Sequence, residues 1–152
     1  MGTKYKGSKK EVRILDAYIR FSRAALSLES QLSRQLTEYG LTYSQFGVLE
    51  VLLHIGPMNQ KEIASKLLTS NSNLVTVIDN LEKGGLVKRE RSEKDRRNFI
   101  VNLTDRGKKI ILELFPMHLN IITERFNVLT DREIETLGRL SKKVGLNVKE
   151  QL

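Results

Sequence analysis

The stretch NQKEIASKLLTSNSNLVTVIDNLEKGG, residues 59–85, decides the fold of this chain. Apolar residues recur at spacings of three and four in two segments, 59–67 and 71–83, and this period is typical of helices with one buried face. A polar break separates the segments, Ser70 is placed to cap the second, and Gly84-Gly85 ends it. The stretch therefore predicts two helices joined by a tight turn, a helix-turn-helix unit.

The second helix of this unit has a polar outward face. Such a face can enter the major groove of DNA, where Asn pairs with adenine, Ser and Thr serve bases or phosphates, and Val meets a thymine methyl group. The candidate DNA-binding residues are Ser70, Asn71, Ser72, Asn73, Val75 and Thr76. Polar residues at a helix start also act simply as caps, and for Ser70 alone we favour the capping role. For the group 71–76 we favour base recognition.

After the two glycines the apolar period changes to two, which predicts two short strands, 86–91 and 98–103. They form a β-hairpin whose charged loop would act as a wing in an adjacent minor groove, where the negative potential attracts arginine. The predicted contacts of this wing are Lys94, Asp95, Arg96 and Arg97. DNA would repel Asp95, so we expect it to hold Arg97 in an extended pose. The alternative is an exposed ion pair of little energetic weight.

The segments on either side of this unit predict further helices. Residues 9–38 form one long helix that is apolar on more than one side, so another surface must cover it. Thr104 caps a later helix, which Pro116 should kink or break, and a last helix covers 131–144. Capping boxes mark three helix starts: Thr42 with Gln45, Asn59 with Glu62, and Thr130 with Glu133. We predict a mainly α fold with a small β-hairpin.

Composition narrows the class of protein. The chain has 152 residues, of which 39% are hydrophobic, enough for one domain with a buried core. It has no cysteine and two histidines, which excludes thiol chemistry and a conventional metal cluster, so we expect no metal and no cofactor. No apolar stretch approaches the roughly 18 residues of a membrane span. The basic N-terminal segment leads into charged residues rather than an apolar signal core, so we expect a cytoplasmic protein with no membrane partner.

The charge is strongly positive and unevenly distributed. Lys and Arg number 26 against 18 Asp and Glu, a formal net charge of +8 that favours a polyanionic partner. Residues 60–109 hold 12 basic and 7 acidic side chains, whereas residues 110–152 hold 6 of each. Residues 1–59 hold 8 basic and 5 acidic side chains, so more than half of the excess lies on the helix-turn-helix and wing segment. A charged run alone is more often a solvated surface. It indicates a DNA-binding segment here only because a helix-turn-helix lies next to it.

Three motifs follow one another at a defined spacing. They are Leu81-Glu82-Lys83-Gly84-Gly85-Leu86-Val87 at the end of the second helix, Asp95-Arg96-Arg97 in the wing, and Leu103-Thr104-Asp105-Arg106-Gly107 at the next helix start. Together, and over nearly its whole length, the chain resembles the MarR family of winged helix-turn-helix transcriptional regulators. The family often has Asp-Pro just before the wing motif, where Ser92-Glu93 stands here.

The resemblance implies a single MarR-like domain, 1–152. It implies a winged helix-turn-helix DNA-binding lobe over 42–104 and a helical dimerisation lobe in which 9–38 and 105–147 of two chains interlock. Family members often bind small aromatic or amphipathic effectors between the lobes, and Tyr18, Tyr43 and His54 are candidates for the edge of such a pocket by position. The peroxide-sensing branch uses a cysteine that this chain lacks, so we do not expect that activity.

We therefore predict a homodimeric, sequence-specific transcriptional regulator of double-stranded DNA that reads a pseudo-palindromic operator. We expect a repressor, although the position of the operator decides between repression and activation, and the resemblance implies release by a small-molecule effector. The alternative is an architectural protein that coats DNA without specificity, or a winged-helix module that binds another protein. Competition by non-specific DNA separates these alternatives. No nucleophile–base pair, phosphate-binding glycine loop or acid cluster indicates an enzyme.

Overall fold

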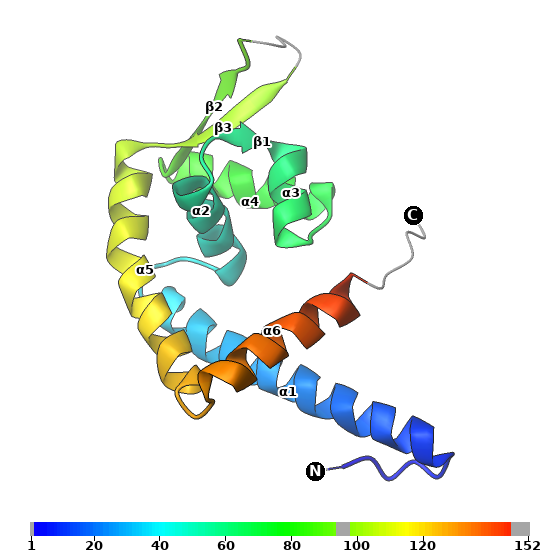
Figure 1. Cartoon of the computed structure of the whole chain (residues 1–152). Coiled ribbons are helices and arrows are strands. Elements are labelled where there is room, and N and C mark those ends of the chain that lie inside the picture. Colours follow the sequence, from blue (N-terminus) through cyan, green and yellow to red (C-terminus); the bar gives the residue numbers. More distant parts are fainter. Residues whose placement is uncertain (1, 94–97, 147–152) are drawn as a thin grey trace. The chain divides into compact units, whose positions relative to one another are not determined.

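The computed structural model describes residues 2–93 and 98–146. The elements follow the chain in this order: α1 (Lys9–Thr37), α2 (Tyr43–His54), β1 (Met58–Asn59), α3 (Gln60–Leu67), α4 (Asn71–Lys83), β2 (Val87–Arg91), β3 (Phe99–Leu103), α5 (Asp105–Phe126) and α6 (Asp131–Gly145) (Figure 1). The predicted mainly helical fold with a small antiparallel sheet is confirmed. The predicted wing residues Lys94, Asp95, Arg96 and Arg97, and residue 147, lie outside the described residues. The chain forms two compact units, residues 1–118 and 119–152.

Side-chain caps set the helix starts. At α2, the hydroxyl of Thr42 accepts a hydrogen bond from the N–H of Gln45 at 3.1 Å, and the Gln45 side chain accepts one from the N–H of Thr42 at 2.9 Å. The same reciprocal bonds at Asn59 before α3 and at Thr130 before α6 confirm the three predicted capping boxes. A fourth, in which Ser8 pairs with Glu11, starts α1 and was not predicted.

A glycine turn ends α4. Gly85 has a φ of 70°, in the left-handed region that favours glycine. Its N–H bonds the carbonyl of Glu82 at 2.9 Å, and the N–H of Leu86 bonds the carbonyl of Leu81 at 2.9 Å. This is the Schellman pattern, and both leucines are buried beneath it. The turn therefore fixes the direction in which the chain leaves α4 for β2.

The sheet has three strands rather than the two of the predicted hairpin. Its order is β1-β3-β2, with Met58 opposite Val101 and Arg89 opposite Val101 on the other side. The predicted strands lie where expected, at Val87–Arg91 and Phe99–Leu103. The extra strand β1 has two residues, too few to show a period of two in the sequence. It ties the start of α3 to the middle of β3 (Figure 1).

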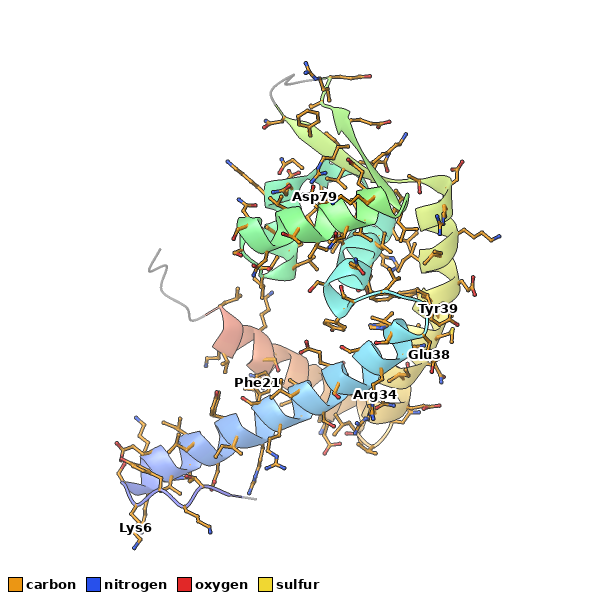
Figure 2. All side chains as sticks on the ribbon, turned by 180° about the vertical axis from the view of Figure 1, so that it is seen from behind. Lys6, Phe21, Arg34, Glu38, Tyr39 and Asp79 are labelled. Atoms are coloured by element: carbon orange, nitrogen blue, oxygen red, sulfur yellow. The ribbon has the colours of Figure 1, made fainter. Side chains whose placement is uncertain are left out.

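The core of the first unit lies between α2, α3, α4, the sheet and the start of α5. Its largest fully buried side chains include Phe46, Leu49, Ile63, Leu74, Ile78, Leu81 and Ile111. Leu36 brings the end of α1 into this core. By contrast, Ile14, Tyr18, Phe21 and Leu26 on the first part of α1 are 49% to 64% exposed (Phe21 is labelled in Figure 2). Within one chain, only the C-terminal end of the predicted apolar stripe is buried.

Of the kink or break predicted at Pro116, the break does not occur, because α5 runs without interruption from Asp105 to Phe126. Proline lacks the N–H that would bond the carbonyl of residue 112. Both Leu112 and Pro116 are exposed, so water can satisfy that carbonyl and the helix loses little. Thr104 caps this helix as predicted, since its hydroxyl accepts a hydrogen bond from the N–H of Gly107 at 3.0 Å.

The second unit contains the end of α5 and the whole of α6. No residue of α6 is buried, although Ile134, Leu137, Leu140 and Val144 recur at helical spacing on it. An exposed helix with such an apolar stripe typically packs against another helix or sheet. None of the described helices combines the length and the apolar character needed to cross a membrane.

Candidate nucleic-acid interface

The helix-turn-helix is built by buried residues on the facing sides of α3 and α4. Ile63 and Ala64 on α3 pack with Leu74 and Ile78 on α4, and all four are at most 6% exposed. Ala64 is small, so it allows the two helices to approach closely. The turn between them passes through Leu68, whose φ of 52° is left-handed and whose side chain is 94% exposed. The predicted unit therefore forms with α4 held at a fixed position on the core.

The predicted recognition residues lie together on the outward face at the start of α4. All six are exposed: Ser70, Asn71, Ser72, Asn73, Val75 and Thr76. The hydroxyl of Ser70 accepts a hydrogen bond from the N–H of Asn73 at 3.3 Å, so Ser70 is the N-cap, and its Oγ lies 3.2 Å from that of Ser72. The side-chain amides of Asn71 and Asn73 and the hydroxyl of Thr76 are exposed and can both donate and accept hydrogen bonds.

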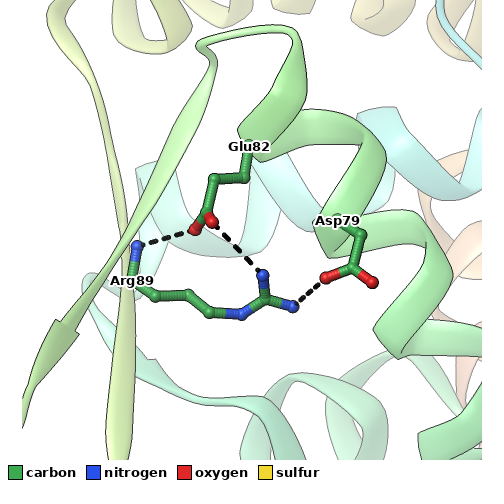
Figure 3. Close-up of polar contacts among 3 residues, drawn as sticks. All are labelled: Asp79, Glu82 and Arg89. Atoms are coloured by element: carbon green, nitrogen blue, oxygen red, sulfur yellow. Dashed lines mark hydrogen bonds and ion pairs between the residues drawn. The ribbon is translucent and has the colours of Figure 1, made fainter.

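An ion-pair cluster joins α4 to β2 (Figure 3). Arg89 Nη2 lies 2.6 Å from Asp79 Oδ1, and Arg89 Nη1 lies 3.5 Å from Glu82 Oε1. The backbone N–H of Arg89 also donates to Glu82 Oε2 at 3.1 Å. The Arg89 side chain is 23% exposed, about half the exposure of either carboxylate. Sequence analysis missed this cluster, because no local pattern brings a strand residue to a helix.

The described part of the hairpin carries further charge. Arg91 places its guanidinium 5.9 Å from the ring centroid of Phe99, the residue opposite it on β3. Lys88 pairs with Glu90 on its own strand at 2.6 Å, and this contact raises the pKa of Lys88. Both pairs project from the strands that lead to the predicted wing tip. The predicted Asp95–Arg97 bridge lies outside the described residues.

A polar cleft of about 410 Å³ separates the sheet from the helix-turn-helix. Asn59 and Lys61 line it from the start of α3, Asn71 from the start of α4, and Arg89 and Asn98 from the hairpin. Amide side chains and the ammonium of Lys61 therefore converge beside the recognition face, whereas the guanidinium of Arg89 is already paired with Asp79 and Glu82. Such a lining suits an anionic backbone better than an apolar ligand.

The three predicted pocket-edge residues occupy different places. Tyr43 lines a cavity of about 320 Å³ together with Phe46, Glu50, Leu74 and other residues of α2 and α4. Burial, with a contribution from Glu29 and Glu50, raises the pKa of Tyr43, and burial also raises the pKa of Glu50. Tyr18 is exposed on α1, and His54 packs edge-on against Phe115 with centroids 4.6 Å apart.

Tyr18 and His54 line neither the cavity beside Tyr43 nor the polar cleft. A residue outside this prediction, His118, is buried with its ring centroid 4.2 Å from that of Phe46. Burial lowers the pKa of His118. In the described part of the chain, no group of three His, Asp or Glu residues is arranged to hold a metal ion.

A helix-turn-helix with an outward polar face, followed by an antiparallel hairpin, defines a winged helix-turn-helix protein. A family model described as MarR family matches residues 41–99. The HTH-type transcriptional regulator MhqR of Bacillus subtilis is 33% identical over 136 residues, which cover 90% of this chain and 94% of that protein. The chain belongs to the MarR family and is a transcriptional regulator rather than an enzyme.

Solved structures agree with this assignment. Sco3205, a MarR family regulator from Streptomyces coelicolor in complex with DNA, has a TM-score of 0.85 and 25% identity, covering 97% of this chain and 94% of that one. A mutant of MarR from E. coli complexed with operator DNA has a TM-score of 0.77 and 25% identity, covering 87% and 95%. The winged helix-turn-helix fold is therefore shared over nearly the whole chain.

Proposed function

We propose that the protein is a cytoplasmic, homodimeric repressor that reads a pseudo-palindromic operator. In this proposal, α4 enters the major groove, the wing enters the adjacent minor groove, and a small-molecule effector releases the DNA. Repression, the operator, the dimer and the effector all belong to the proposal. DNA binding itself is favoured by the two DNA-bound relatives, Sco3205 and E. coli MarR.

The observation that carries the proposal is the outward face of α4. Leu74, Ile78 and Leu81 hold this helix on the core, and Asn71, Asn73 and Thr76 remain exposed at its start. Asn can hydrogen-bond both N6 and N7 on the major-groove edge of an adenine, and Thr can bond a base or a phosphate. An architectural protein would need no such set of base-reading side chains, so the alternative of non-specific coating is less favoured.

The apolar helices support a dimer of this reader. Ile14, Phe21 and Leu26 on α1 and Leu137 and Leu140 on α6 are exposed in the single chain. Apolar surface of this extent marks an interface in most proteins, and two-fold symmetry is the commonest arrangement. A two-fold dimer presents two copies of α4 and so reads two half-sites, with centres about one helical turn or 10 bp apart.

The cavity beside Tyr43 is the candidate effector site. Its lining reaches α4 through Asn73, Leu74 and Val77, so a ligand there would contact the helix that we expect to read the operator. An effector bound between α2 and α4 could favour one position of α4 over another and so change operator affinity.

Selection of bound sequences from a random DNA pool tests the function. The proposal expects an inverted repeat, and Asn73→Ala or Thr76→Ala should cost about 1–3 kcal/mol at one position of each half-site. Arg97→Ala should instead weaken binding to many sequences and lower the salt dependence, since each phosphate contact contributes about 0.9 to that slope. Recovery of no consensus would favour the architectural alternative.

A further inference from the structure

The contacts between α4 and β2 hold the strand at both the side chain and the backbone of Arg89. The guanidinium of Arg89 spans Asp79 at 2.6 Å and Glu82 at 3.5 Å, two carboxylates that lie three residues apart on one helix face. Glu82 also accepts the backbone N–H of Arg89 at 3.1 Å. Two contacts along the helix oppose sliding of the strand, and the backbone contact opposes its rotation (Figure 3).

The charges of this cluster do not suit direct contact with DNA. Asp79 and Glu82 outnumber Arg89, so the three side chains sum to a net negative charge. The guanidinium is already bound by the two carboxylates and is 23% exposed. A phosphate would have to displace at least one of these carboxylates to bind it. Carboxylates in a basic lobe are repelled by a polyanion, so their presence here indicates a local structural task.

The cluster completes a rigid connection between the start of α4 and the hairpin. At one end, the glycine turn after Lys83 fixes how the chain leaves α4. Farther along, Arg89 in the middle of β2 contacts Asp79 on α4. Asp79 lies within two helical turns of Asn73 and Thr76, which we predict to read bases. A strand held at two points relative to a helix has a defined direction, whereas a strand held only at the turn can swing.

We infer that Arg89 is a positioning residue that sets the spacing, in base pairs, between the bases read by α4 and the minor groove entered by the wing. This inference rests on the proposed function, because it requires that both elements read one operator. Arg89 contacts no base in this account. It acts by holding the wing at one distance from α4. Operators whose narrow minor groove lies at a different distance from the bases read by α4 therefore bind more weakly.

The test is competition binding of the full-length protein to a set of operators. Every operator keeps the selected major-groove half-sites and carries an A/T tract, which narrows the minor groove. The distance between the half-site and the tract, called the offset, increases by one base pair from one operator to the next. The wild type should prefer one offset by about tenfold, the effect of one lost base contact. Arg89→Gln should reduce that preference to about threefold or less while the major-groove consensus is unchanged.

Lys88→Gln is the matched control. It removes the same charge from the neighbouring residue, which is half exposed and pairs with Glu90 on its own strand. This variant should keep the wild-type offset preference. A second variant guards against misfolding by unpaired carboxylates: Asp79→Asn, Glu82→Gln and Arg89→Gln together remove the cluster without leaving an unpaired charge, and should also lose the preference.

The outcomes separate this inference from the proposed function. A wild type with no preferred offset would show that the wing does not read the minor groove, and would overturn both. A wild type with a preferred offset that Arg89→Gln and the triple variant retain would overturn the positioning role alone. A fall of about 0.9 in the salt slope for Arg89→Gln, with the offset preference kept, would instead identify Arg89 as a phosphate contact.

Discussion

At Gly107, α5 packs against the backbone of Leu86, two residues after the C-cap of α4. A Cβ built on Gly107 would lie 1.9 Å from the backbone oxygen of Leu86. A backbone atom cannot rotate away as a side chain can, so the contact could be relieved only by shifting α5 or the strand. The glycine in the Leu103–Gly107 motif is therefore required by the packing of backbone on backbone.

We predict that Gly107→Ala lowers the free energy of unfolding by about 3 kcal/mol, because the added methyl group overpacks a site without free space. Urea denaturation at a fixed chain concentration measures this. Gly138→Ala is the control: nothing lies within 4 Å of its Cβ on α6, so it should raise stability by about 0.5–1 kcal/mol through helix propensity alone. Equal effects of the two substitutions would contradict the packing argument.

Ser70 has two candidate roles, as a cap and as a DNA contact. Its hydroxyl caps α4 in the structure, so Ser70→Ala should lower the free energy of unfolding by about 1 kcal/mol, and Ser70→Asn, another good cap, should restore it. If capping is its main task, operator affinity follows stability in both variants. Fluorescence anisotropy with operator DNA checks this. An Asn variant as stable as the wild type but about tenfold weaker in binding would assign Ser70 a direct contact.

At the scale of single elements, the turn between α3 and α4 carries backbone strain. Leu68 adopts the left-handed region, which costs a residue with a Cβ about 1–2 kcal/mol, and its side chain is too exposed to recover this by burial. Leu68→Gly should therefore raise the free energy of unfolding by about 0.5–1 kcal/mol, after the higher backbone entropy of glycine is subtracted.

Thermal and urea unfolding measure the effect of Leu68→Gly. Leu68→Ala keeps the Cβ and hence the strain, so it should remain within about 0.5 kcal/mol of the wild type. If both variants gained stability equally, removal of the exposed leucine side chain rather than relief of the backbone would be the cause.

Elements with local signals were predictable from the sequence, and those that depend on distant partners were not. Thr42, Asn59 and Thr130 each form their capping bonds within three residues, so the helix starts could be located. By contrast, β1 exists because Met58 pairs with Val101, 43 positions away, and the Arg89 cluster exists because β2 returns to α4. The outward face of α4 was predicted because its buried face has the helical period.

At the scale of the whole molecule, we predict a dimer held by the apolar stripes of the terminal helices. Leu137→Gln with Leu140→Gln should shift sedimentation to the monomer at micromolar concentration and abolish operator binding, because one half-site supplies too little affinity. The control, Arg132→Gln with Arg139→Gln, changes the charged positions of the same helix and should leave the dimer intact. A folded, monomeric wild type would contradict this assignment.

The strand order β1-β3-β2 has a consequence for how the protein behaves at high concentration. It places β2 at one edge of the sheet, where backbone groups that face outward can pair with a strand of another molecule. Four of its five residues are charged, and Glu82 already occupies the N–H of Arg89. The opposite edge, β1, is only two residues long. The charges of β2 thus also protect the sheet against edge-to-edge aggregation, so neutralising several of them would cost solubility.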